Sequence, residues 1–299
     1  MTAPATAARP GTVKVWMLAA RPPTLWAAVV PVVVGTALAV ADGDFRLPVL
    51  LMALAAALLL QVGTNFANDV FDFERGADTG ERLGPPRVTQ SGLLTPSDVR
   101  RGMAAAFGGA VLLGLGLTYY GGWPIIAIGV LSIVAGIIYT GGPWPTGYHG
   151  LGDAFVFCFF GLVAVGGTYY LHTDTLRWAA IAAAVPVGLL ITAILVVNNL
   201  RDRETDARSG KRTLAVRLGD RVTRLQYAAL VGGSYIAIVA MAAVLSWWLL
   251  LPLLSLPFAA RVTMPVLRGA MAGDLNLALK RTAQLQLIFG LLLAAGFLP

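Results

Sequence analysis

The chain has few charged residues, a single cysteine and two histidines among its 299 residues. Only 12% of the residues are charged and 57% are hydrophobic, whereas soluble domains carry about 25% charged residues. This scarcity of charge excludes an ordinary soluble protein. The lone Cys158 excludes a disulfide framework and a paired thiol centre.

Long apolar runs occupy most of the chain. A helix needs about 20 predominantly apolar residues to cross a bilayer. Nine stretches approach or exceed this length, near residues 16–41, 48–72, 99–121, 123–140, 153–171, 178–200, 222–245, 247–267 and 282–298. No strand pattern stands out between them. We therefore expect an all-α integral membrane protein of about nine transmembrane helices. Residues 1–12, rich in Ala, Thr and Pro, are expected to form a disordered tail, and residues 13–299 a single transmembrane domain.

The basic residues are distributed unevenly between the two sides that nine spans would define. All of the 22 Lys and Arg residues except Arg46 and Arg177 fall on the side of the N-terminus. Basic loops favour the cytoplasmic side, so this asymmetry predicts a cytoplasmic membrane protein with the N-terminus inside and the C-terminus outside. The net charge of +7 also favours contact with membrane lipids or an anionic substrate. Nucleic acid binding is not expected, because the basic residues share their loops with acidic ones.

Two polar clusters end two of the apolar runs on that cytoplasmic side. The first contains Asn65, Asn68, Asp69 and Asp72, with Asp78 after a turn, and the second contains Asn198, Asn199, Asp202 and Asp206. Spacings of three and four residues place each cluster on one face of a helix. Carboxylates near a membrane span are costly, so two matched groups indicate a common purpose. Hard cations such as Mg²⁺ take oxygen ligands and are often completed by substrate phosphates, so we expect two ligand stripes around a diphosphate.

Basic and aromatic residues near the two stripes fit the same interpretation. Arg75 follows the first stripe, and Lys211 and Arg212 follow the second, where they would complement a diphosphate. The alternative is that such residues only obey the charge rule for membrane topology, and this is favoured for Arg221. Tyr139 ends the fourth run and is a candidate either to face the cavity or to belong to an interfacial aromatic belt.

The motif Asn68-Asp69-x-x-Asp72, together with Asp202-x-x-x-Asp206, resembles the UbiA-type superfamily of membrane prenyltransferases. The stretches 84–92, 139–143 and 198–214 are similar to the menaquinone branch, which prenylates 1,4-dihydroxy-2-naphthoate. In one position the chain departs from the wider superfamily, which often has an Asp four residues after Asp72. Here that position is Gly76, and Asp78 follows two residues later, a spacing that is similar to that of the menaquinone branch.

The resemblance implies a fold of helices around a central cavity that opens to the cytoplasmic side. It also implies Mg²⁺-dependent transfer of a polyprenyl group from a polyprenyl diphosphate to the naphthoate, with loss of CO₂ and diphosphate to give demethylmenaquinol. Two Mg²⁺ ions are expected. The metal ligands would be Asp69, Asp72, Asp78, Asp202 and Asp206.

Further roles follow from the same resemblance. The catalytic residues would be Asp72, Asp202, Asp206, Lys211 and Tyr139, and substrate would be bound by Asn65, Asn68, Arg75, Arg87, Gln90, Asn198, Asn199, Arg212 and Arg21. Arg21, at the start of the first span, is the candidate for the acceptor carboxylate. Two alternatives remain open: the same chemistry on 4-hydroxybenzoate or homogentisate, and a transporter.

Overall fold

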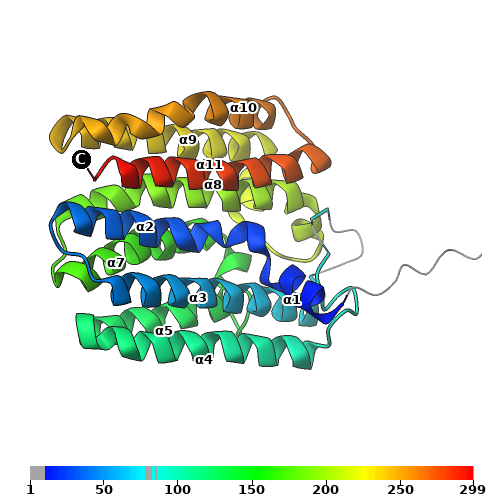
Figure 1. Cartoon of the computed structure of the whole chain (residues 1–299). Helices are drawn as coiled ribbons and strands as arrows, with labels where there is room; N and C mark the ends of the chain where they lie inside the picture. Colours follow the sequence, from blue (N-terminus) through cyan, green and yellow to red (C-terminus); the bar gives the residue numbers. More distant parts are fainter. Residues whose placement is uncertain (1–10, 78–82, 85, 299) are drawn as a thin grey trace, which may run out of the picture.

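The computed structural model describes residues 11–77, 83–84 and 86–298, and within these ranges every regular element is a helix. Figure 1 shows the long helices lying side by side, with their connections gathered at the two ends of the bundle. Most of the expected tail and the candidate ligand Asp78 lie outside the described residues. Thr12, placed in the tail by the sequence, is already the first residue of a helix.

The helices follow one another through short connections. In chain order they are α1 (Thr12–Ala20), the 3-10 turn η1 (Pro22–Thr24), α2 (Trp26–Ala41), α3 (Leu47–Glu74), α4 (Pro96–Gly121), α5 (Trp123–Ile138), the 3-10 turn η2 (Thr146–His149), α6 (Gly152–Val156), the π-helical turn η3 (Phe157–Val163), α7 (Ala164–Thr173), α8 (Trp178–Arg208), α9 (Leu214–Val244), the 3-10 segment η4 (Trp247–Ser255), α10 (Leu256–Leu267) and α11 (Ala272–Ala295).

The number of spans in the described chain differs from the nine expected. Seven helical segments are long and apolar enough to cross a membrane, and α1 with α2 makes an eighth if this bent pair is one span. The remaining candidate, α5, has only 16 residues. At 1.5 Å per residue it reaches about 24 Å, short of a hydrocarbon core of about 30 Å. The prediction of nine full spans is therefore not confirmed, whereas the all-α membrane architecture is.

The first span is bent by 51° between α1 and α2. The bend falls at Arg21, which adopts a left-handed backbone conformation with φ 53° and ψ 66°. Pro22 and Pro23 follow, and Pro disfavours the right-handed helical conformation in the residue before it. A non-glycine residue in the left-handed region is strained, and such residues concentrate at functional sites. Arg21 lines the central cavity at this bend.

The tightly packed core lies on one side of the bundle, among α2, α8, α9 and α11. Its fully buried members include Leu190, Ile238, Leu285 and Phe289. Glycine lets these helices approach closely: a Cβ atom on Gly290 would lie 2.1 Å from a methyl group of Val30. The inner faces of α3, α5 and α6–α7 are packed less completely, and this is where the cavity lies.

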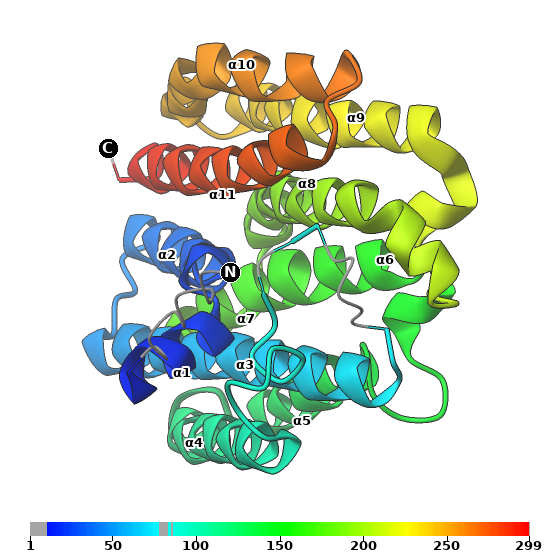
Figure 2. The ribbon, with the colours of Figure 1, turned by 90° about the vertical axis from the view of Figure 1, so that its right-hand side faces the viewer.

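The two ends of the bundle differ in chemistry. The end that carries α1 also holds the connections after α3, α5, α8 and α10, and Figure 2 views the molecule from this end. At the opposite end, Arg46 pairs with Asp174 at 2.6 Å and Arg177 pairs with Asp42 at 2.5 Å. The C-terminus lies at that second end (Figure 1).

Candidate active site

A cavity of about 460 Å³ opens among α2, α3, α5, α6–α7 and α8. Eleven of the predicted site residues line it: Arg21, Asn65, Asn68, Asp72, Arg87, Tyr139, Asn198, Asn199, Asp202, Asp206 and, from the α8–α9 connection, Lys211. The two polar stripes therefore face a common space. Lys211 joins them directly, since its backbone N–H donates to the carbonyl of Asp206 at 2.8 Å and its Nζ lies 3.7 Å from a carboxylate oxygen of Asp72.

Asp72 is the centre of the first stripe. Its side chain is 3% exposed and pairs with Arg87 at 2.7 Å. The hydroxyl of Tyr148 donates to the other carboxylate oxygen at 2.8 Å. A buried carboxylate is tolerated only when opposite charge and hydrogen bonds surround it. Asp72 is therefore held in a fixed position at the polar end of the cavity.

Asp69, also a member of the first stripe, contacts the chain segment that follows α3. It is 1% exposed and is not among the residues that line the cavity. Its two oxygens accept hydrogen bonds from the backbone N–H groups of Val88 and Thr89, at 3.2 and 3.0 Å. The carboxylate of Asp69 thus anchors the segment that brings Arg87 to Asp72, and its role as a metal ligand stays a prediction.

The second stripe is organised by Arg201, which the sequence analysis did not select. Its guanidinium donates twice to the carboxylate of Asp202, at 2.7 and 2.6 Å, and also to Asn198 at 2.9 Å. A fourth hydrogen bond reaches the side-chain oxygen of Asn276 in α11 at 3.0 Å, and Asn276 in turn donates to the carbonyl of Leu83. This network ties α8, α11 and the segment after α3 together across the end of the bundle (Figure 2).

Space around Arg201 is limited by Gly84. A Cβ atom at Gly84 would lie 2.8 Å from the Arg201 guanidinium, so a side chain there would displace it. The signal for Arg201 in the sequence is weak, because neighbouring helical residues point about 100° apart and its position next to Asp202 suggests a different face. The long arginine side chain bends back to reach the stripe.

Three of the predicted substrate-binding residues do not line the cavity. Arg75 donates to the carbonyls of Thr140 and Gly142 and thereby fixes the connection after α5. The side chain of Arg212 is exposed, and its backbone N–H donates to Tyr148. Gln90 is half-buried in the segment anchored by Asp69. These residues support the walls of the site.

Tyr148 is a second residue that the sequence analysis missed. Besides its hydrogen bond to Asp72, its ring lies 5.2 Å from Lys211 Nζ and 5.5 Å from the Arg75 guanidinium. Two cations on one aromatic ring define the positions of both basic side chains. The only sequence signal was its place in a connection on the same side of the membrane as the stripes.

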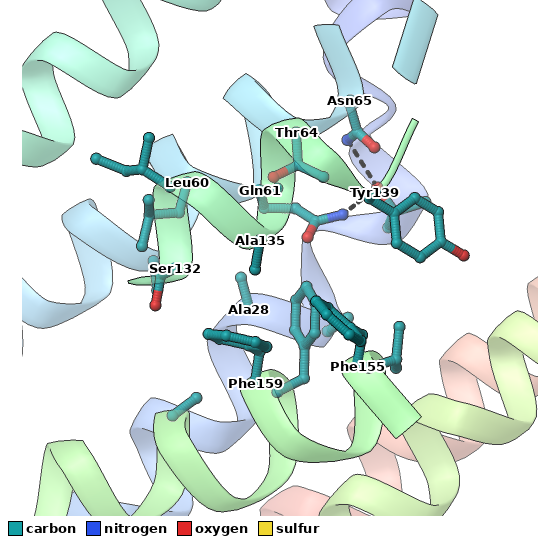
Figure 3. A pocket seen from close by; sticks show the side chains of 18 of the residues that line it. Ala28, Leu60, Gln61, Thr64, Asn65, Ser132, Ala135, Tyr139, Phe155 and Phe159 are labelled. Atoms are coloured by element: carbon teal, nitrogen blue, oxygen red, sulfur yellow. Dashed lines mark hydrogen bonds between the residues drawn. The ribbon is translucent and has the colours of Figure 1, made fainter. Parts of the chain in front are cut away.

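The deeper part of the cavity is apolar. Figure 3 shows Tyr139, Phe155 and Phe159 around it, with Ala28 and Ala135 leaving the space open. The lining continues to residues of α4 and α5 that are about half exposed, including Leu115 and Ile126. Phe159 lies in the π-helical turn η3, and such turns are frequent at functional sites. This shape suits a ligand with a charged head and a long apolar tail.

The oxygen-rich end of the cavity fits a hard divalent cation bound together with an anionic ligand. Within the described residues, no three His, Cys, Asp or Glu side chains already lie close enough to hold a metal ion. Mg²⁺ normally takes one or two protein carboxylates and completes its shell with water and substrate phosphates. Asp72 on one wall and Asp202 with Asp206 on the other provide such a partial ligand set.

The match to known proteins agrees with this geometry. Residues 28–297 match the UbiA prenyltransferase family. The chain belongs to this family. Over 295 residues it is 37% identical to a 1,4-dihydroxy-2-naphthoate octaprenyltransferase of Haemophilus influenzae, covering 95% of this chain and 96% of the relative. A Mycobacterium tuberculosis protein of the same name is 40% identical over 282 residues, covering 94% and 96% of the two chains.

Solved UbiA structures share the fold of this family member. A UbiA homologue from Aeropyrum pernix K1 superposes with a TM-score of 0.68 at 13% identity, covering 90% of this chain and 96% of that one. A homologue from Archaeoglobus fulgidus, solved with GPP and Mg²⁺, gives 0.66 at 12% identity, covering 94% and 99%. The family assignment and the all-α fold expected from the sequence are thus confirmed.

Proposed function

We propose that this UbiA-family protein transfers a polyprenyl group from polyprenyl diphosphate to 1,4-dihydroxy-2-naphthoate, with release of CO₂ and diphosphate. The acceptor is supported by relatives of that name at 37–40% identity over nearly the whole chain. One observation supports this type of reaction most directly: Lys211 contacts residues of both acidic stripes at one end of an apolar cavity. A transporter gains no support from this arrangement.

The residues at the polar end would hold the diphosphate. Lys211 supplies a positive charge beside the leaving group, and Arg87, already paired with Asp72, adds a second. Mg²⁺ would be held by Asp72, Asp202 and Asp206, with Asn68 and Asn198 beside them, and would stabilise charge on the departing diphosphate. Two Mg²⁺ ions would bind, with Asp78 as a further ligand. The deeper apolar walls would take the prenyl chain.

The chemical step forms one carbon–carbon bond and breaks two bonds. The allylic C–O bond breaks and its electron pair leaves with the diphosphate. An electron-rich carbon of the naphthoate ring attacks the allylic carbon, and loss of the carboxyl group as CO₂ returns its electron pair to the ring. Phe155, Phe159 and Tyr139 exclude water from the allylic carbon and present aromatic faces to developing positive charge. Arg21 is the proposed partner of the acceptor carboxylate.

Product analysis tests this function. Purified protein in lipid nanodiscs, given Mg²⁺ and geranyl diphosphate, should convert 1,4-dihydroxy-2-naphthoate to a decarboxylated prenyl product, with release of diphosphate and CO₂. Parallel reactions with 4-hydroxybenzoate and homogentisate should give little product. Faster prenylation of either alternative ring, measured by mass spectrometry, would reassign the acceptor, and no product from any ring would reject the enzyme.

Lys211 should act on the leaving group rather than on general charge balance. Lys211→Ala is expected to lower kcat/KM for the prenyl diphosphate. The loss should correspond to about 2–4 kcal/mol of transition-state stabilisation, as for removal of an electrostatic donor to a transition state. The matched control is Arg221→Ala, because Arg221 is exposed on α9 and does not line the cavity. If both variants lose the same amount of kcat/KM at saturating acceptor, Lys211 does not bind the diphosphate and its charge only sets the membrane topology.

We further propose that the end of the bundle that carries α1 and the two polar stripes faces the cytoplasm. The motivation is the concentration of basic residues there, since among the described residues only Arg46 and Arg177 lie at the other end. In a Cys158→Ala background, Ala207→Cys should react with an impermeant thiol reagent only in opened vesicles or from the cytoplasmic side. Thr175→Cys should react from outside. The reverse labelling pattern would invert the orientation.

A further inference from the structure

A polar side chain without a complete set of partners lies in the middle of the apolar cavity. Gln61 of α3 is 9% exposed and lines the cavity. Its Nε2 donates to the hydroxyl oxygen of Thr24 at 3.3 Å, whereas its Oε1 is buried and has no hydrogen-bond partner among the described residues. Figure 3 shows the side chain projecting among Ala28, Ala135 and Phe159. None of these apolar side chains offers a donor.

The orientation of the Gln61 amide is dictated by Thr24. The Thr24 hydroxyl donates its only hydrogen to the carbonyl of Arg21, at 2.9 Å. It can therefore only accept from Gln61, so the amide nitrogen must face Thr24. Asn65 donates to the same hydroxyl at 3.1 Å and to the carbonyl of Ala20 at 2.9 Å. With this cluster fixed, the Gln61 carbonyl oxygen is directed away from Thr24 and into the cavity.

A buried carbonyl oxygen held in this way is costly unless a ligand supplies a donor. Neither part of a prenyl diphosphate does so, because its tail is a hydrocarbon and its head accepts hydrogen bonds. A hydroxylated aromatic acceptor does. Gln61 lies one helical turn deeper than Asn65, and the Arg21 backbone is tied to the same cluster. Arg21, the proposed partner of the acceptor carboxylate, lines the same cavity as Gln61.

We propose that Gln61 Oε1 accepts a hydrogen bond from a hydroxyl of the bound aromatic acceptor and so selects dihydroxylated rings. The inference rests on the proposed prenyl transfer to a naphthoate. In 1,4-dihydroxy-2-naphthoate the 1-hydroxyl lies beside the carboxylate and bonds to it internally, which leaves the 4-hydroxyl as the free donor. Gln61 is thus a specificity-determining residue for that hydroxyl.

Equilibrium binding separates this role from simple support of the fold. The dissociation constants of 1,4-dihydroxy-2-naphthoate and of 1-hydroxy-2-naphthoate, which lacks the 4-hydroxyl, are measured by fluorescence quenching under anaerobic conditions. Wild-type protein should bind the dihydroxy ring about tenfold more tightly, as expected for one buried hydrogen bond. In Gln61→Leu this ratio should fall to about one.

The matched control is Gln286→Leu. Gln286 is 1% exposed in α11, and within the described part of the chain its amide also lacks partners. It does not line the cavity, so its replacement should leave the ratio at the wild-type value. A structural role for Gln61, or a water molecule bound to its carbonyl, predicts that both rings weaken equally and the ratio persists. That result overturns the inference. It remains distinct from failure of the proposed function, in which wild-type protein yields no prenylated naphthoate.

Discussion

Asp72→Asn and Asp202→Asn should each lower kcat/KM for prenyl transfer by about 10³-fold, on the scale of losing a group that stabilises transition-state charge. Each substitution removes one negative charge from a stripe that lines the diphosphate end of the cavity. Asparagine keeps an oxygen that can still accept from Arg87 at position 72 or from Arg201 at position 202. The loss therefore reports on charge rather than on packing.

Alanine would be a less informative replacement at these positions. It would leave the Arg201 guanidinium, with its side chain 2% exposed, without its carboxylate, and breaking a buried ion pair costs about 3–5 kcal/mol of stability. The matched control is Asp274→Asn, because Asp274 is an exposed carboxylate in the first turn of α11. Steady-state kinetics with membrane insertion checked in parallel decides the outcome. Near-normal turnover in Asp202→Asn would remove the second stripe from the reaction.

The spacing of polar residues was sufficient to predict the two stripes. Helical periodicity requires residues three, four and seven positions apart to share a face, and Asn65, Asn68 and Asp72 do line one wall of the cavity. The same rule also selected Asp69, whose carboxylate instead reaches the backbone of the segment at Val88. Periodicity gives the face of a helix but not the partner that meets it. Only the folded chain shows that this connection competes for Asp69.

The residues that were missed act across connections distant in sequence. Arg201 depends on Asn276, 75 residues away, and Tyr148 reaches Asp72 across 76 residues. No local pattern encodes such contacts, because they depend on how the ends of α8, α11 and α3 meet. Gln61 is different: it lies four residues before Asn65 and extends the first stripe by one turn. Its polarity within an apolar run was the available signal.

The apolar runs of the sequence predicted where most of the membrane spans lie, but not where each helix begins and ends. Hydropathy located the spans, but it placed residues 123–140 in one span, whereas the helix ends at Ile138. The bend at Arg21 is only partly predictable. Pro22 and Pro23 explain why a helix should stop there, but they do not by themselves predict that Arg21 adopts a left-handed conformation and lines the cavity.

Removal of divalent metal should reduce prenyl transfer to background, and excess Mg²⁺ should restore it. The physical reason is the charge at the polar end of the cavity. Asp72, Asp202 and Asp206 line the site, while Arg87 and Arg201 are already paired with the first two carboxylates. With Lys211, the cationic side chains only balance the three carboxylates, so the charge of a bound diphosphate is uncompensated in a site of low dielectric unless metal cations bind with it.

Two measurements make this prediction specific to the diphosphate. Chelator should abolish binding of the prenyl diphosphate as well as turnover. It should leave the affinity for 1,4-dihydroxy-2-naphthoate almost unchanged, because the acceptor is proposed to bind at Arg21 and Gln61, away from the carboxylates. Ca²⁺, which is larger and prefers more protein ligands than this site offers, should restore less activity than Mg²⁺. Full turnover in excess chelator would show that the acidic stripes do not assemble a metal–diphosphate site.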